Sequence, residues 1–454
     1  MREKCDPQKS LFHIMPQNAI SEELEGISKV LEANQQILNV VYADLVGQRK
    51  TDTGRTGMTA EQVLRCAILK QYRDLTYEEL SFHLGDSKSF RAFARLSCGQ
   101  MPSASTLQEN IKTLSEETWE ALNRAILGIA REQGIEKGRT VRMDSTAVET
   151  NIHHPTDSSL LEDGVRIITR LLIRGKRLSP TPGYRYADHR RVVKKRALAI
   201  LNDKKKGTLK KCYTDLLDIA LQVRGYALDA IEVLESFVSP DIMQILEAHG
   251  LAEELERAVG ILDKVMDQTR RRVIEGEKVP ATEKVVSFFE CHSDIIEKGE
   301  RETVFGHKIF VVGGTSGLIL DCVIKRGNPA DSSLFVPLVE RQEKLYGRPP
   351  RQTTADGAFA SADNLREAKE MGVSDVSFAK RRGLSVLEMV KSTWVYKKLR
   401  NFRAGIEANI SVLKRAFGLI RCTWTGWGGF VKYVRSAIFA YNLLTLARLN
   451  RTTA

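Results

Sequence analysis

Cysteine is scarce in this 454-residue sequence, and none of its seven cysteines sits at a metal-binding spacing. There is no C-x-x-C pair and no Cys/His cluster, which argues against a zinc site. The odd number and wide scatter of the thiols exclude a dense disulfide framework and suit a reducing cytoplasm.

Targeting signals and membrane-length apolar runs are also missing. The first fifteen residues, MREKCDPQKSLFHIM, contain no apolar core of signal-peptide length. The longest apolar run toward the end, residues 436–449, is too short to cross a bilayer and contains Tyr441, Asn442 and Arg448. We therefore expect a soluble protein that is located in the cytoplasm and has no membrane partner.

Motifs for nucleotide cofactors are absent too. No G-x-x-x-x-G-K-[ST] occurs, and no G-x-G-x-x-G follows a strand-like run, so a nucleotide cofactor has no support. Internal repeats and low-complexity tracts are not found. With 42% apolar and 28% charged residues, the chain can bury two or three domain cores, which excludes a disordered tail, a collagen-like fibre and a small disulfide scaffold.

Positive charge, in contrast, is in excess and concentrated. Lys and Arg number 69 against 57 Asp and Glu, a net charge of +12, which indicates a polyanionic partner, nucleic acid ahead of a membrane surface. Residues 166–211 hold sixteen Lys or Arg against two Asp, so this segment alone carries +14. Tyr184, Tyr186 and His189 are interleaved, as expected where rings stack on bases beside a phosphate-binding groove, although a solvated helix surface is the alternative. The DNA-binding candidates in this segment are Arg190, Arg191, Lys194, Lys195, Lys204, Lys205 and Lys206.

The N-terminal region has a helical pattern. Apolar residues at helical spacing predict a lead-in helix within the first 50 residues, and a loop rich in Gly and Thr follows at 51–58. The helices expected at 64–70 and 77–84 fit either a helix-turn-helix or a plain helical bundle. A hydroxyl residue precedes Glu or Gln by three positions at three expected helix starts, which are Thr59 with Gln62, Thr76 with Glu79, and Ser105 with Gln108.

Strand-like and helical runs alternate through the rest of the chain. Val, Met and Thr predict a strand at 139–148 with Asp144 in its middle, and a helical pattern covers 158–278. The sequence Gly-Gly-Thr-Ser-Gly at 313–317 predicts a hairpin connection. A mixed α/β unit is therefore divided by a helical insertion. The further elements expected are strands at 284–291, 303–312, 318–325, 353–356 and 373–379, and helices at 364–371, 403–417 and 434–449.

Three acidic residues are candidates for chemistry, and each has a simpler interpretation. Asp144 is a poor strand former that could cap the next element of the chain, and Asp356 precedes a Gly as in an Asp-Gly turn. Glu407 lies on an expected helix, where a solvated salt bridge is common. Arg403 and Lys414 fall within about 40° of Glu407 on that helix. A carboxylate between two cations could hold a metal-bound phosphate.

The spacing of these last three residues is one that a known family shares. Arg403, Glu407 and Lys414 match the end of the Y-(2)-R-(3)-E-(6)-K motif of bacterial insertion-sequence DDE transposases, although Arg400 stands where that family has Tyr. Residues 57–114 resemble the helical domain ahead of the family's catalytic core, and the whole arrangement is most similar to the group named ISNCY. Four further segments resemble the family in the same order, and these are V-R-M-D-S-T at 141–146, F-G-H-K at 305–308, G-N-P-A-D at 327–331 and T-A-D-G-A-F at 354–359.

The resemblance implies an α/β fold with an RNase H-like mixed sheet core, a helical N-terminal domain and a large helical insertion. The implied parts are a helical, DNA-binding N-terminal region at 1–135, the first catalytic strand region at 136–156, the basic helical insertion at 157–283, and the remainder of the catalytic domain at 284–454.

The resemblance also implies the chemistry. Asp144, Asp356 and Glu407 would form a DDE triad that holds two Mg²⁺ or Mn²⁺ ions about 4 Å apart, with Asp144 between them, while Arg403 and Lys414 would bind DNA phosphate. The partners would be double-stranded DNA, as terminal inverted repeats and as target, and a second copy of the chain in a homodimer associated with the nucleoid. Two alternatives stay open: an RNase H-like nuclease or domesticated relative without strand transfer, and a non-catalytic DNA-binding protein.

Overall fold

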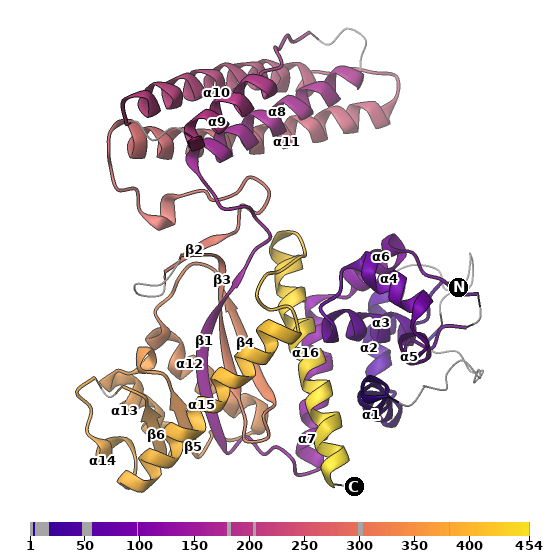
Figure 1. The fold of residues 1–454 in the computed structure, drawn as a ribbon, viewed down its shortest axis with the longest axis vertical. Helices are drawn as coiled ribbons and strands as arrows, with labels where there is room; N and C mark the ends of the chain where they lie inside the picture. The colour runs from indigo at the N-terminus through magenta and orange to yellow at the C-terminus, as the bar shows by residue number, and fades with distance from the viewer. Residues whose placement is uncertain are drawn as a thin grey trace. The chain divides into compact units, whose positions relative to one another are not determined.

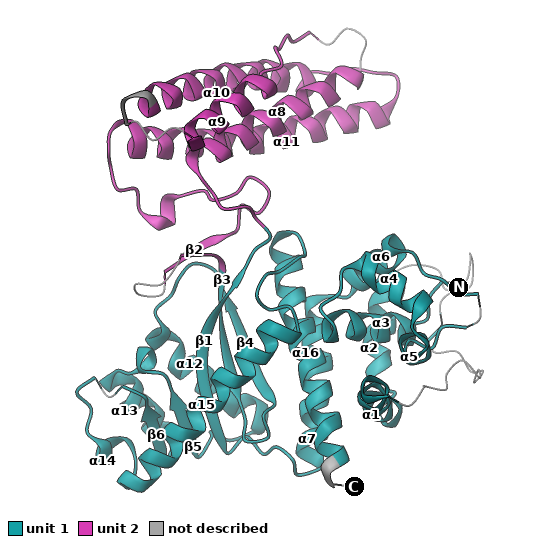
Figure 2. Ribbon diagram, viewed as in Figure 1, with its two compact units in different colours: residues 1–151, 307–454 teal, residues 152–306 magenta. Residues whose placement is uncertain are grey.

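A computed structural model describes residues 3–4, 18–47, 57–97, 99–178, 183–202, 206–297, 303–380 and 382–453. The chain divides into two compact units, as Figure 2 shows. Unit 1 comprises residues 1–151 and 307–454, and unit 2 comprises residues 152–306. Each unit has a hydrophobic core of its own, so unit 2 is an insertion between the two segments that form unit 1.

The described part of unit 1 begins with helices, as the sequence predicts. Two of the three predicted helix starts are confirmed as capping boxes. The hydroxyls of Thr59 and Thr76 accept hydrogen bonds from the backbone N–H groups of Gln62 and Glu79, whose side chains accept from the backbone N–H groups of the two threonines. The helices of this region are α1 (Ala19–Ala33), α2 (Ile37–Val46), α3 (Ala60–Tyr72), α4 (Tyr77–Asp86), α5 (Lys88–Phe93), α6 (Ala104–Thr113) and α7 (Glu116–Glu132).

The third predicted capping box, at Ser105 and Gln108, is wrong. Helix α6 begins two residues earlier than that box requires, because the side chain of Ser103 accepts a hydrogen bond from the N–H of Thr106. Ser105 therefore lies inside the first turn of the helix, where its hydroxyl is not needed as a cap.

A mixed sheet follows, which lies in unit 1 except for β2 and the first residues of β3. The strand order is β2-β3-β1-β5-β6, with β4 paired to β3. Strands β1 and β6 run parallel to β5, and β3 and β4 are antiparallel across the predicted hairpin. This architecture, visible in Figure 1, confirms the α/β fold class and is consistent with an RNase H-like core. The strands are β1 (Thr140–Glu149), β2 (Asp294–Ile296), β3 (Val304–Gly313), β4 (Ile319–Lys325), β5 (Gln352–Ala355) and β6 (Asp375–Phe378).

Helices from the C-terminal half pack on this sheet. Helix α15 lies against β1, β5 and β6 (Figure 1), so its side chains can reach the middle of the sheet. Helix α16 packs against α1, α7 and β4. The buried side chain of Asn442 on α16 accepts a hydrogen bond from the N–H of Ile319 at 2.8 Å and donates one to the Ile319 carbonyl at 2.7 Å. The helices are α12 (Phe335–Tyr346), α13 (Ala362–Glu370), α14 (Val386–Met389), α15 (Thr393–Ala416) and α16 (Gly426–Thr453).

Unit 2 is a bundle of long helices, which confirms the helical pattern of the insertion. Each helix contributes one apolar stripe to the core, for example Leu161, Val193, Leu216 and Leu255 in chain order. The helices are α8 (Asp157–Leu178), α9 (Arg190–Asn202), α10 (Lys206–Glu235) and α11 (Ile242–Thr269).

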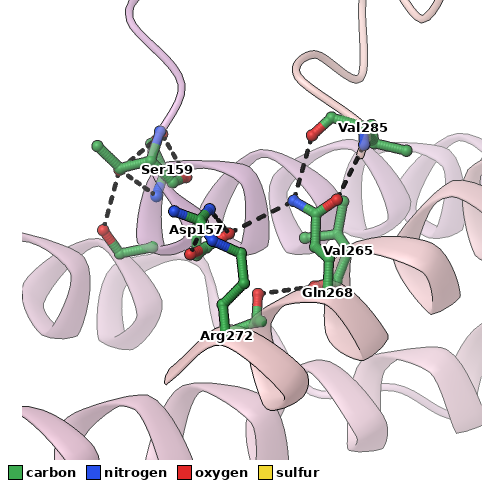
Figure 3. Close-up of polar contacts among 9 residues, drawn as sticks. Asp157, Ser159, Val265, Gln268, Arg272 and Val285 are labelled. Carbon is green, nitrogen blue, oxygen red and sulfur yellow. Dashed lines mark hydrogen bonds and ion pairs between the residues drawn. The ribbon is translucent and has the colours of Figure 1, made fainter. Parts of the chain in front are cut away.

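One predicted strand, at 284–291, is wrong, and Figure 3 shows why. The side-chain amide of Gln268 on α11 accepts from the N–H of Val285 at 2.8 Å and donates to its carbonyl at 3.2 Å. The extended segment therefore pairs with a helix side chain instead of a strand, and the short strand β2 forms after it. The same amide donates to the buried carboxylate of Asp157, which also accepts from Arg272 at 3.1 Å. Burial raises the pKa of Asp157, while Arg272 opposes that shift.

Candidate active site

The two candidate aspartates come from neighbouring parallel strands. Strands β1 and β5 pair with Met143 opposite Ala355, and Asp144 and Asp356 are the residues that directly follow this pair. Adjacent strands lie about 4.8 Å apart and paired residues point to the same face, so the two carboxylates meet at one place on the sheet. The side chain of Asp144 is 17% exposed and that of Asp356 is 44% exposed, so Asp144 is the inner of the two.

Helix α15 brings a third carboxylate and a guanidinium to the same place. Nη1 of Arg403 lies 3.9 Å from Oδ2 of Asp144 and 3.8 Å from Oδ1 of Asp356. Nη2 of the same side chain donates to Oε1 of Glu407 at 2.7 Å. The three acids that the sequence singles out, although far apart in the chain, therefore surround one cation.

Arg142 docks helix α15 on strand β1. It lies two residues before Asp144, so both side chains point to the face that α15 covers. Its Nη1 donates to the carbonyl of Phe402 at 3.2 Å, and its guanidinium lies 4.7 Å from the centre of the Phe402 ring. Burial lowers the pKa of Arg142. Sequence reasoning missed this residue, although its position two before Asp144 in V-R-M-D-S-T was the available signal.

Ser145 links Asp144 to a largely buried ion pair. The backbone N–H of Ser145 donates to Oδ1 of Asp144 at 2.7 Å, and the Ser145 hydroxyl donates to Oδ2 of Asp331 at 2.8 Å. Asp331 is ion-paired with Lys308, which also donates to the carbonyl of Pro329 at 3.0 Å. The G-N-P-A-D segment thus supplies an acid to which the sequence had assigned no role.

Lys414 is placed differently from Arg403. Helix α15 is continuous between the two residues, as is required if Arg403, Glu407 and Lys414 are to share one face of it. Lys414 nevertheless lies seven residues beyond Glu407, about 10 Å along the helix. Burial lowers the pKa of Lys414, and the nearby carboxylate of Glu149, the last residue of β1, opposes the shift. The charge that Lys414 faces is therefore that of Glu149 at the end of β1.

The donor atoms of the site suit a divalent cation. Carboxylate oxygens are the ligands that Mg²⁺ and Mn²⁺ prefer, and three acids converge here from two strands and a helix. Across the described ranges, no three His, Cys, Asp or Glu side chains are grouped so that they could hold a metal ion. The carboxylates are thus of the right chemical type for a metal site, but their present arrangement does not form one, and the charge at their centre is the guanidinium of Arg403.

Helix α9 of unit 2 carries part of the basic segment. It buries only one stripe of small or apolar residues and leaves Arg191, Lys194 and Lys195 exposed. Arg190 is neutralised by Asp188, which accepts from its Nη2 at 2.6 Å; this contact raises the pKa of Arg190 and lowers that of Asp188. Lys204 and Lys205 lie outside the described residues, and of Lys206 only the backbone is described, at the start of α10.

The rings interleaved with these cations pack within the helix bundle of unit 2. Tyr184 is buried, and its hydroxyl donates to the carbonyl of Leu172 at 2.7 Å. His189 stacks on Tyr226 with ring centres 6.1 Å apart. Tyr184 therefore cannot stack on a base as the sequence suggested, because its ring fills the core of unit 2.

The possible helix-turn-helix of the N-terminal region is formed by α3 and α4. Helix α3 is almost entirely buried. Helix α4 carries Glu78, Glu79 and Asp86 but no Lys or Arg, so its exposed face would repel DNA phosphate. This charge distribution favours the plain helical bundle for the pair.

Comparison with known proteins gives two matches to protein-family models. Residues 268–443 match the model described as a transposase DDE domain, and residues 11–113 match the model described as a transposase domain (DUF772). Together the two matches span more than half of the chain, and the first includes Asp356, Arg403 and Glu407. No curated protein and no solved structure matches the chain. In the described part of the chain, no helix has both the length and the apolar character needed to cross a membrane.

Proposed function

Because the chain belongs to the insertion-sequence DDE transposases, we propose that it cuts DNA at the terminal inverted repeats of its element and joins the freed 3′-OH ends to target DNA. The observation that carries the proposal is the convergence of Asp144, Asp356 and Glu407 around one guanidinium. Membership of the ISNCY-like group is part of the same proposal and rests on the order of the sequence motifs alone.

The proposed roles follow from position and residue type. Asp144, Asp356 and Glu407 would hold two divalent cations, Mg²⁺ or Mn²⁺, which when bound would activate water or a 3′-OH and stabilise the leaving oxygen. Asp144 would lie between the ions because it is the inner aspartate, and the other two acids would each hold one side. Arg403 and Lys414 would bind phosphate oxygens through charge-assisted hydrogen bonds.

Contact with double-stranded DNA would also involve helix α9. Arg191, Lys194 and Lys195 are exposed on one short helix, as suits binding to a phosphate backbone without base recognition. We propose a homodimer as the active form, so that two element ends are processed together, in association with the nucleoid. Light scattering after size exclusion, with and without a duplex carrying an element end, tests this stoichiometry.

A combined cleavage and joining assay tests the function. The purified chain is incubated with a labelled duplex carrying one inverted repeat found beside the coding region, and with supercoiled target plasmid, in Mg²⁺, in Mn²⁺ or in EDTA. We expect cleavage at the repeat and joining to the plasmid in either metal, and neither product in EDTA. Cleavage without joining would instead indicate the RNase H-like nuclease, and binding without cleavage would indicate a non-catalytic DNA-binding relative.

A further inference from the structure

Arg403 occupies the centre of the candidate active site. Its two terminal nitrogens lie within 4 Å of carboxylate oxygens from Asp144, Asp356 and Glu407, which come from three different elements. We propose that Arg403 is an internal counter-ion of the DNA-free protein, which occupies the position of the metal ions and must turn aside before they bind. This inference rests on the proposed function, because it assumes that the three acids are the metal ligands.

The charges explain why a counter-ion is needed there. Three carboxylates that converge without a cation repel one another, and their partial burial strengthens the repulsion. One guanidinium offsets a single negative charge of the three, so the site keeps an excess of negative charge that still attracts divalent ions. The same guanidinium repels those ions and blocks their approach to the oxygens, so it competes with them directly.

The contacts of Arg403 are weak enough to be exchanged. Only the bond to Glu407, at 2.7 Å, has hydrogen-bond length, whereas the two aspartate contacts are 3.8 and 3.9 Å. Nε of Arg403 is buried and makes no hydrogen bond in the described part of the chain. A DNA phosphate would offer two oxygens to the fork of the guanidinium, a stronger arrangement than the one it has.

A coupling between the two ligands follows. If a DNA phosphate draws Arg403 away from the acids, the acids become free to bind metal, and each ligand then raises the affinity of the protein for the other. The DNA-free protein would hold metal poorly, which would restrict phosphodiester chemistry to the complex with DNA.

The test measures Mn²⁺ binding to the full chain without DNA by isothermal titration calorimetry. We expect Arg403→Gln to bind Mn²⁺ about tenfold tighter than the wild type, because a full positive charge within 4 Å of the ligands is removed. Arg400→Gln is the matched control, since it removes an exposed cation less than one turn away on the same helix, and it should change the affinity less than twofold. The single ammonium group of Arg403→Lys cannot face three acids at once, so its Mn²⁺ affinity should lie between those of the wild type and Arg403→Gln. This variant replaces Arg403→Gln in the test if the latter does not fold.

The outcomes separate this inference from the function on which it rests. Unchanged or weaker Mn²⁺ binding by both Arg403 variants would overturn the counter-ion proposal. Asp356→Asn is then combined with Arg403→Gln, and it should abolish the gain in affinity. If Asp356→Asn and Glu407→Gln instead leave Mn²⁺ binding intact in every background, the acids are not the metal ligands and the proposed function fails as well.

Discussion

Gly405 of helix α15 lies directly against the guanidinium of Arg142 on strand β1. A Cβ placed on Gly405 would be 1.7 Å from Nη1 of Arg142, so any side chain here would require the Arg142 guanidinium or the helix to move. Arg403 and Glu407 lie two residues to either side of this contact. The glycine costs α15 about 1 kcal/mol of helix stability relative to Ala, but it leaves room for the Arg142 guanidinium beside the two site residues.

Replacing Gly405 by Ala tests that relationship. We expect the free energy of unfolding to fall by about 1–3 kcal/mol, because the added methyl group forces the helix or Arg142 to move. Cleavage should fall by about 100-fold, since a displacement of about 1 Å at a catalytic group has that effect. Gly128→Ala on α7 is the control: no atom lies within 4 Å of a Cβ there, so the change should stabilise the protein by about 0.5–1 kcal/mol. Equal effects of the two substitutions on urea unfolding would contradict the argument.

Neutral isosteres of the three acids form the second prediction. Asp144→Asn, Asp356→Asn and Glu407→Gln should each abolish cleavage in Mg²⁺ and in Mn²⁺, because each removes a ligand charge with little change in size. DNA affinity, measured by fluorescence anisotropy, should stay within a few-fold of the wild type. Asp363→Asn, at a carboxylate that is 71% exposed on α13, should cleave normally. A variant that keeps full cleavage would not belong to the triad.

Salt dependence tests the role of helix α9. Each phosphate contact contributes about 0.9 to the slope of log K against log salt, so a triple change of Arg191, Lys194 and Lys195 to Gln should reduce the slope by between about 2 and 3. An unchanged slope would indicate that these three side chains do not contact DNA and that this face of α9 is only a solvated surface. The control variant makes the same change at three exposed cations outside α9, namely Lys29, Arg257 and Arg366.

The pH dependence of stability tests the buried Lys70 on α3. Burial lowers its pKa from 10.5 to about 8, with its ammonium 5.1 Å from the centre of the Tyr77 ring. Between these two pKa values the unfolded chain binds more protons, so this group makes stability rise as pH increases from about 8 to 10.5. Lys70→Met should be more stable than the wild type by roughly 3 kcal/mol at pH 7, and that advantage should shrink through this window.

Urea unfolding of wild type and variant at pH 7, 9 and 10 measures the difference. Lys29→Met is the control at a side chain that is 74% exposed, and its effect should be small and independent of pH. A difference in the free energy of unfolding between the wild type and Lys70→Met that does not change with pH would mean that burial does not lower the pKa of Lys70.

Local order in this protein is readable from the sequence. The capping boxes at Thr59 and Thr76, the hairpin at 313–317 and the strand around Asp144 depend on residues a few positions apart. Hydrogen bonds at helix ends and side-chain periodicity act over that range, so the pattern alone suffices. The order of the motifs along the chain likewise indicated the family, without any knowledge of how they pack.

The tertiary structure decided which distant residues become neighbours. The register of β1 with β5 places Asp144 beside Asp356, and the packing of α15 brings Arg403 between them. The same kind of contact converts the expected strand at 284–291 into a segment bound by Gln268. These contacts join residues more than ten and up to hundreds of positions apart, and no local pattern encodes them. They depend on how closely whole elements approach one another, and at Gly405 the lack of a side chain leaves the space that the Arg142 guanidinium occupies.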